Sequence, residues 1–156
     1  MNINFKAQKL NSTSIFQLKQ NSAEYIKKPV SFIKFDLKSS SDLISLKKMN
    51  SLWPYTFARS MYKSIQRENN AEIYALTLQT DKFEKIECKK ILGLAETIKI
   101  DDNSVHLEFL QTHPDYKHKE FSKQISFYKG IGSALINSIK NLKYVDKITT
   151  NSLFIL

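Results

Sequence analysis

The chain has 156 residues, of which 42% are hydrophobic and 12% aromatic, enough to bury the core of one ordinary domain without cross-links. Its single cysteine, Cys88, excludes an internal disulfide and a cysteine-based metal cluster, and it fits a reducing compartment. The sequence shows no apolar run after a basic start and no segment as apolar and long as a membrane span. We therefore expect a cytoplasmic protein without a membrane partner.

The formal charge of +9 raises the question of nucleic-acid binding, because basic side chains neutralise phosphates and release counterions. The only arginines are Arg59 and Arg67, while lysines occur in every part of the chain. Arginine forks are the usual readers of bases and phosphates. The composition therefore favours a lysine-solvated surface over a specific nucleic-acid partner, and such a surface also attracts anionic ligands.

The first half of the chain predicts strands followed by two helices. Ile3, Phe5 and Ala7 alternate with polar neighbours, which indicates a short strand before a polar Asn/Ser/Thr stretch. Residues 30–37 form a stronger strand, and residues 39–42 supply an N-cap with an acid in the first helical turn. Trp53-Pro54 ends that helix and Asn69-Asn70 ends the next one. The helical spacing is carried by Leu43, Leu46 and Met49 in the first helix, and by Phe57, Met61, Tyr62 and Ile65 in the second.

The second half predicts three consecutive antiparallel strands, a helix and a last strand. Residues 71–78 and 91–100 are rich in strand formers, and a charged connection over 80–90 joins them. A turn at 101–104 leads into a strand that stops at Pro114, and the last strand covers 147–152. We expect a single α/β (α+β) domain over residues 1–156, with a mixed, mostly antiparallel sheet and helices on both faces. Residues 1–28 are a candidate N-terminal extension of it.

Two of the three glycines, Gly130 and Gly132, lie where a loop turns into a helix. The apolar residues that follow at helical spacing are Ile131, Leu135, Ile136, Ile139 and Leu142. A helix N-terminus presents backbone N–H groups and the positive end of the helix dipole, which together bind phosphate. Without a Cβ, the glycines let a pyrophosphate approach the main chain closely. The alternative is a tight turn that caps an ordinary helix.

The order strand, proline, loop, Gly-x-Gly and helix resembles motif A of the GNAT superfamily of acetyl-CoA-dependent N-acetyltransferases. The resemblance runs from Lys90 to Leu142, with two departures: Phe127 stands where the family has Gln or Arg, and the connection is stretched over residues 115–129. It implies a GNAT-like fold that uses acetyl-CoA as the acetyl donor. The pyrophosphate is then expected on Lys129, Gly130, Ile131, Gly132, Ser133 and Ala134. The pantetheine arm is expected beside the main chain of Leu110, Gln111 and Thr112.

In such an enzyme the acceptor amine attacks the thioester, a general base takes the amine proton, and backbone N–H groups polarise the carbonyl. His106 and Glu108 have the same parity on the strand and can share one face. The family often has a glutamate on this strand, so Glu108 is the first candidate base and His106 the second. The structural alternatives are a salt-bridged sheet residue and a core histidine.

Family members often have a tyrosine that protonates the leaving thiolate, and Tyr128 and Tyr116 are the candidates here, with core packing as the alternative. His113 and His118 have no carboxylate or cysteine at ligand spacing, so the sequence assigns no metal.

The sequence ends at Leu156, where the family continues with a fourth helix and a closing hairpin. The resemblance therefore implies a C-terminally truncated fold, whose missing lobe is supplied by another subunit or is lost. The apolar run Leu153–Leu156 at an open strand edge predicts a homo-oligomer.

Three functions are compatible with the sequence. The first is an acetyl-CoA-dependent N-acetyltransferase acting on a primary amine of a small molecule or a protein. The second is a catalytically inactive, coenzyme A-binding or protein-interaction remnant of the same fold. The third is a lysine-rich nucleic-acid binder. The Gly-x-Gly segment favours the first, and the short C-terminus favours the second.

Overall fold

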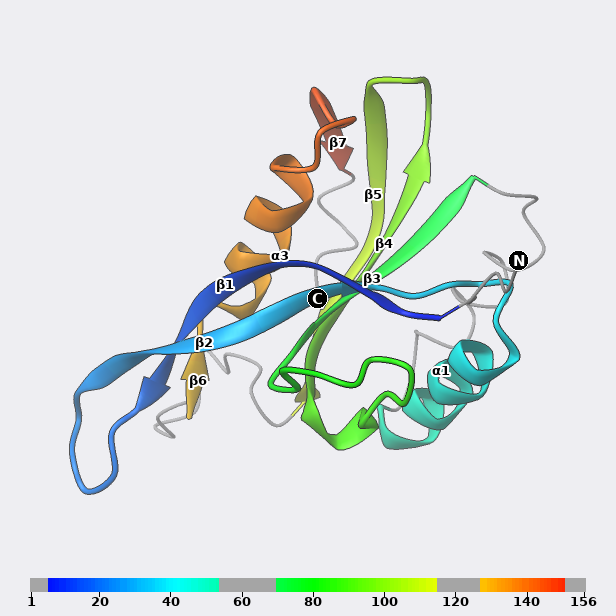
Figure 1. The fold of residues 1–156 in the computed structure, drawn as a ribbon. Helices are drawn as coiled ribbons and strands as arrows, with labels where there is room; N and C mark the ends of the chain where they lie inside the picture. The colour runs from blue at the N-terminus through cyan, green and yellow to red at the C-terminus, as the bar shows by residue number, and fades with distance from the viewer. Residues whose placement is uncertain (1–5, 54–69, 115–126, 151–156) are drawn as a thin grey trace.

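The computed structural model describes residues 6–53, 70–114 and 127–150, which fold into one curled sheet with helices on both faces (Figure 1). The strands are β1 (Gln8–Leu18), β2 (Tyr25–Lys34), β3 (Ala71–Thr77), β4 (Ile91–Lys99), β5 (Ser104–Thr112), β6 (Tyr128–Lys129) and β7 (Lys147–Thr150). The helices are α1 (Ser40–Leu52), α3 (Ile131–Lys140) and the 3₁₀ turn η1 (Cys88–Lys90).

The described strands form a seven-stranded sheet in the order β6-β1-β2-β3-β4-β5-β7. Neighbouring strands in it are antiparallel, except that β5 and β7 are parallel. The strands predicted at 71–78, 91–100 and 105–113 are confirmed as the antiparallel run β3, β4 and β5. The mixed, mostly antiparallel sheet predicted from the sequence is therefore confirmed.

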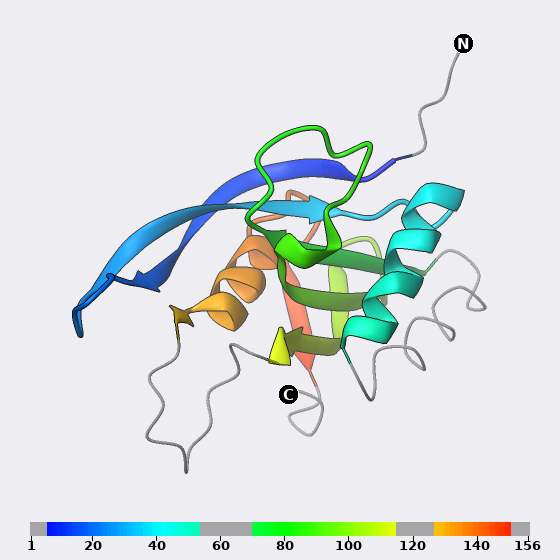
Figure 2. The same cartoon turned by 90° about the horizontal axis from the view of Figure 1, so that it is seen from below.

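The sheet has an apolar cluster on each face, because neighbouring residues of a strand point to opposite sides. Phe32 and Tyr74 belong to the cluster under α3, whereas Ile33 and Ala75 belong to the cluster under α1. Figures 1 and 2 show α1 and α3 packed against different parts of the sheet. The first cluster contains Ile131, Ala134, Leu135 and Ile139 of α3. The second contains Leu46 and Met49 of α1 and its C-cap, Trp53.

The N-cap of α1 follows the sequence pattern closely. Ser39 caps the helix and its Oγ accepts a hydrogen bond from the backbone N–H of Asp42 at 3.3 Å. The Asp42 carboxylate in turn accepts from the backbone N–H of Asp36 at 2.7 Å. Burial raises the pKa of Asp42 above its usual range, although the hydrogen bond from Asp36 opposes this. The predicted cap with an acid in the first turn is therefore confirmed, and it fixes where α1 leaves the sheet.

Gly93 lets α3 pack close to the sheet. An added Cβ at Gly93 would lie 2.7 Å from Ile131 Cγ2 and 2.7 Å from Leu135 Cδ1, closer than carbon atoms pack. Gly93 belongs to β4, whereas Ile131 is the first residue of α3. The missing side chain in the strand therefore helps to position the N-terminal turn of the helix.

The N-terminal strand differs from the prediction. The structure places β1 at Gln8–Leu18, in the stretch that the sequence pattern treats as polar connection, and β2 begins at Tyr25 rather than at residue 30. Only Ile15 is buried among the β1 residues, because the distal part of the β1–β2 hairpin is solvated on both faces. The sequence therefore lacks the apolar alternation that marks a half-buried strand. Within the segment 1–28, residues 8–18 therefore form one strand of the sheet and residues 25–28 begin the next strand.

Some predicted features lie outside the described residues: the second helix with Phe57 to Ile65, the candidates Tyr116 and His118, and the tail Leu153–Leu156. The strand predicted around Ile3 lies partly outside them. Among the described helices, none is long and apolar enough to cross a membrane.

Candidate functional site

The central feature of the site is a β-bulge on β5 at Glu108. On β4, Thr97 pairs with Leu107 and its neighbour Glu96 pairs with Phe109, so Glu108 is the extra residue that makes the bulge. The bulge reverses the side-chain alternation: Leu107 lies in the cluster under α3, whereas Phe109, two residues on, lies in the cluster under α1. The side chains of β5 therefore switch faces of the sheet at Glu108, the predicted catalytic residue.

The described part of β7 pairs with the N-terminal half of β5. The two strands pair from Ser104 opposite Lys147 to Leu107 opposite Thr150, the last described residue. On its other side β5 pairs with β4 through residues 109–112. On the side of residues 110–112 that faces away from β4 no strand pairs within the described residues, and we call this side the open edge.

Main-chain groups of two predicted residues point to this open edge. The backbone N–H of His113 donates to the C=O of the opposite residue, Leu92, at 2.8 Å. Because hydrogen-bonded and non-hydrogen-bonded pairs alternate along an antiparallel ladder, the main chain of Gln111 also faces β4. The N–H and C=O groups of Leu110 and Thr112 face the open edge. Of the three predicted pantetheine contacts, these two have the main-chain orientation that such contacts require.

The N-terminus of α3 has the predicted form. Gly130 is its N-cap in the left-handed region, with φ 86° and ψ 12°, and it makes no side-chain cap hydrogen bond. The backbone N–H of Ala134 donates to the C=O of Gly130 at 2.9 Å, so the N–H groups of Ile131, Gly132 and Ser133 precede the first intrahelical bond. Such N–H groups and the positive end of the helix dipole favour an anion at this helix end.

The helix N-terminus lies directly against the C-terminal half of β5. A Cβ built on Gly132 would be 3.6 Å from Leu110 Cδ2, an ordinary van der Waals contact. Gly132 belongs to the predicted pyrophosphate segment, and Leu110 belongs to the predicted pantetheine segment. The structure thus brings these two segments together from positions more than twenty residues apart in the sequence.

The two candidate bases also lie together. The Nε2 atom of His106 is 3.7 Å from Oε2 of Glu108, and both side chains are about one-third exposed. The other ring nitrogen of His106, Nδ1, is hydrogen-bonded to Thr149 Oγ1 on β7 at 2.9 Å. This second contact fixes the imidazole ring with Nε2 toward Glu108. The Glu108 carboxylate and the His106 imidazole are thus two neighbouring groups that can each accept a proton.

Tyr128 lies elsewhere. It is 8% exposed on β6 and belongs to the apolar cluster under α3. Val105 and Leu107 belong to the same cluster, so His106 between them points to the opposite face of the sheet. The structure therefore does not bring Tyr128 to the His106–Glu108 pair, and the core-packing alternative describes its position.

Two buried polar atoms near the end of β5 have no hydrogen-bond partner among the residues that the structure describes: Nε1 of Trp53 and Oε1 of Gln111. The Trp53 ring meets the His113 ring edge-on, with centroids 5.2 Å apart. Gln111 and His113 share one face of the strand because they are two residues apart. An indole N–H and an amide oxygen without partners are costly to bury, so a polar molecule on this face would satisfy them.

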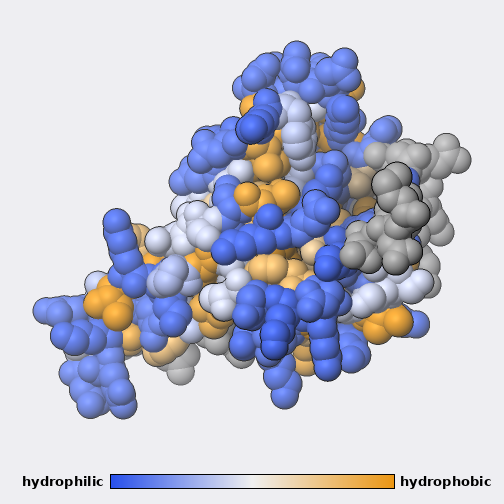
Figure 3. All heavy atoms as spheres, in the orientation of Figure 1, coloured by the Kyte–Doolittle hydropathy of each residue, from blue (hydrophilic) through white to orange (hydrophobic). Residues whose placement is uncertain are grey.

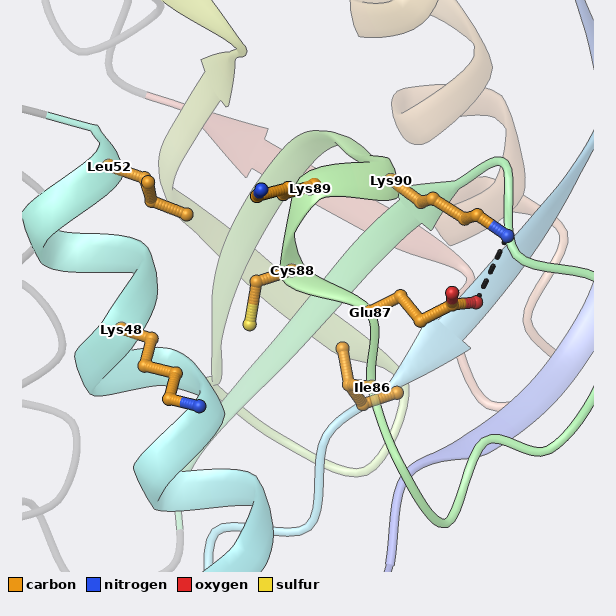
Figure 4. A pocket seen from close by; sticks show the side chains of 7 residues that line it. All are labelled: Lys48, Leu52, Ile86, Glu87, Cys88, Lys89 and Lys90. Atoms are coloured by element: carbon orange, nitrogen blue, oxygen red, sulfur yellow. Dashed lines mark ion pairs between the residues drawn. The ribbon is translucent and has the colours of Figure 1, made fainter.

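A separate cavity of about 610 Å³ lies between α1 and η1 (Figure 4). Its lining contains the charged side chains of Lys48, Glu87, Lys89 and Lys90, and the apolar or thiol side chains of Leu52, Ile86 and Cys88. Lys90 is ion-paired with Glu87 at 3.1 Å. Burial raises the pKa of the Cys88 thiol, which the charge of Lys48 opposes. The cavity contains no residue of the predicted site.

Comparisons with known proteins leave the family open. No family model matches the chain, and no curated protein matches it. Among solved structures, it is similar to an aminoglycoside acetyltransferase from an uncultured soil metagenomic sample, crystallised in complex with sisomicin. That similarity has 12% sequence identity and a TM-score of 0.44, and it covers 78% of this chain and 76% of the other. These values are too low to assign a family or an activity.

Sequence reasoning missed the bulge at Glu108 and the contribution of β1. The bulge depends on which β4 residue pairs with which β5 residue, so no local signal marks it. For β1, the combination of Phe16 near a polar stretch and a turn at residues 19–24 was a usable hairpin signal.

Proposed function

We propose that the chain is an acetyl-CoA-dependent N-acetyltransferase that acts on a primary amine. The single observation that carries the proposal is that Gly132 in the first turn of α3 lies beside Leu110 of β5, whose Cδ2 is 3.6 Å from a Cβ built on Gly132. This neighbourhood supports a phosphate site at the helix end beside an edge whose main-chain groups can hold an extended arm. Coenzyme A has these two parts in succession, a pyrophosphate and a pantetheine chain.

We place the acetyl end of such an arm toward the bulge, because Glu108, the candidate base, lies there. Glu108 then accepts a proton from the acceptor amine, and the Thr149 contact holds His106 beside it. The amine nitrogen forms a bond to the acetyl carbon, the C–S bond breaks, and coenzyme A leaves as a thiolate. A main-chain N–H at the open edge can polarise the thioester carbonyl.

The acceptor is proposed to approach from the face that carries α1. His106 points to this face, and Gln111 and His113 lie on it. The unpartnered Nε1 of Trp53 and Oε1 of Gln111 supply a donor and an acceptor there. An acceptor amine with further polar groups fits this chemistry better than an alkylamine does.

The test is release of free thiol from acetyl-CoA with a panel of polar primary amines. Glu108→Gln is expected to lower kcat by about 10²- to 10⁴-fold with unchanged coenzyme A affinity, as for loss of a general base. Glu24→Gln, an exposed carboxylate in the hairpin turn, is the matched control and should have no effect. An equal loss in His106→Gln with full activity in Glu108→Gln would assign the base to His106. Tight coenzyme A binding without thiol release for any amine would favour the inactive remnant.

A further inference from the structure

One surface of the β1–β2 hairpin carries exposed aromatic rings between lysines. We call it the hairpin outer face and define it by Phe16, Tyr25, Lys27, Phe127 and Lys129. Ile15 and Tyr128 are buried in the cluster under α3, so their neighbours Phe16, Phe127 and Lys129 point to the opposite side. Phe16 is 46% exposed and Phe127 is 43% exposed. Figure 3 shows apolar side chains over the hairpin among hydrophilic ones.

The register of the strands places a lysine on each side of Phe16. Phe16 pairs with Lys27 on β2 and with Lys129 on β6, and directly opposed residues point to the same face. The Nζ atom of Lys129 lies 4.2 Å from the centroid of the Tyr25 ring. This cation–π contact holds the ammonium group on the hairpin outer face. An exposed ring with lysines on both neighbouring strands is suited to a flat base that carries a phosphate.

This face begins at the N-terminus of α3. A Cβ built on Gly130, the N-cap, would lie 3.7 Å from Cδ2 of Phe16. The Phe16 ring therefore lies next to Gly130, at the helix end where the pyrophosphate is proposed to bind. In coenzyme A a single ribose separates the pyrophosphate from the adenine, and that ribose carries a 3′-phosphate. A pyrophosphate at the helix end thus places the adenine within reach of Phe16.

We propose that the hairpin outer face binds the adenosine 3′-phosphate end of coenzyme A. The adenine stacks on Phe16, and the 3′-phosphate lies between Lys27 and Lys129. The proposal rests on the proposed function, because it takes the pyrophosphate at α3 as its starting point. It also explains why a solvated, largely polar hairpin is attached to the sheet beside α3, where it buries little apolar surface.

The test compares binding of coenzyme A, 3′-dephospho-coenzyme A and 4′-phosphopantetheine by calorimetry. Base stacking on an aromatic side chain is worth roughly 1–3 kcal/mol, so Phe16→Ala is expected to weaken coenzyme A binding by about 5- to 150-fold. Binding of 4′-phosphopantetheine, which has no adenosine, should not change. Lys129→Gln should reduce the preference for coenzyme A over its 3′-dephospho form. Ile26→Ala is the matched control, because Ile26 is 49% exposed on the other face of the same hairpin.

The outcomes separate this proposal from the function on which it rests. Wild-type protein that binds neither coenzyme A nor 4′-phosphopantetheine overturns the proposed function and this inference with it. Unchanged coenzyme A affinity in Phe16→Ala, or equal loss for 4′-phosphopantetheine, overturns the adenosine site alone. A Phe16-dependent complex with single-stranded oligonucleotide, without any effect on coenzyme A, would reassign the hairpin outer face to nucleic acid.

Discussion

Gly132→Ala is expected to make the protein more stable and its coenzyme A binding weaker. Gly132 is the second residue of α3, and Gly130 is the glycine with a positive φ in the described part of the chain. The helical backbone at Gly132 therefore suits alanine. The new Cβ would be 3.6 Å from Leu110 Cδ2, so it makes an ordinary contact. Replacing a helical glycine by alanine under these conditions stabilises a protein by about 0.4–1 kcal/mol.

The effect on binding has the opposite sign if the pyrophosphate lies on the first turn of α3. A methyl group at Gly132 occupies space beside the N–H groups that precede the first intrahelical bond, and we expect a loss of roughly tenfold in coenzyme A affinity, or about 1.4 kcal/mol. Urea unfolding measures the stability, and calorimetric titration with coenzyme A measures the affinity. A variant that is more stable and binds coenzyme A as tightly as wild type would refute the phosphate site.

Gly93→Ala is the control for the packing argument. Its Cβ would meet Ile131 Cγ2 and Leu135 Cδ1 at 2.7 Å, and overpacking of this kind typically costs about 1–3 kcal/mol. The midpoint of urea unfolding should fall at an unchanged slope. Two glycine-to-alanine substitutions, one on each side of the same helix–sheet contact, are therefore expected to change stability in opposite directions.

Three further predictions test other parts of the structure. Thr112→Pro should weaken coenzyme A binding with an intact fold, because it removes the Thr112 N–H, which faces the open edge. Thr112→Val keeps that N–H and should bind coenzyme A normally. Equal losses in both variants would argue against a main-chain contact. Burial would raise the pKa of Glu72, but hydrogen bonds from Lys34, Tyr74 and Tyr144 outweigh it and hold that pKa below 4.5. The stabilisation by ionised Glu72 is therefore present above pH 4.5 and lost as the pH falls through the folded-state pKa. Urea unfolding of wild type should thus show a steeper acid loss than Glu72→Gln, and parallel curves would contradict the network. Light scattering should show a homo-oligomer for the full chain and a smaller species for a version cut after Thr150, and identical masses would exclude the C-terminal segment as the contact.

The sequence pattern predicted the elements that depend mainly on residues close to one another in the chain. The N-cap at Ser39 and Asp42 needs only neighbouring residues, and the apolar stripe of α3 depends only on helical spacing. β1 was missed because its stability comes from pairing with β2 and β6, while most of its side chains are solvated. The sequence makes Tyr128 a catalytic candidate. Which way its side chain faces depends on the pairing of β6 with β1, and no local pattern predicts that pairing.

The side-chain directions along β5 could likewise be predicted only in part from the sequence. Parity predicted that His106 and Glu108 share a face, and their side chains do lie 3.7 Å apart. The same rule applied beyond Glu108 gives the wrong face for every residue, because the bulge shifts the alternation by one position. The register with β4 creates that bulge. One inserted residue thus determines which side chains of β5 face α1 and which face α3 beyond Glu108.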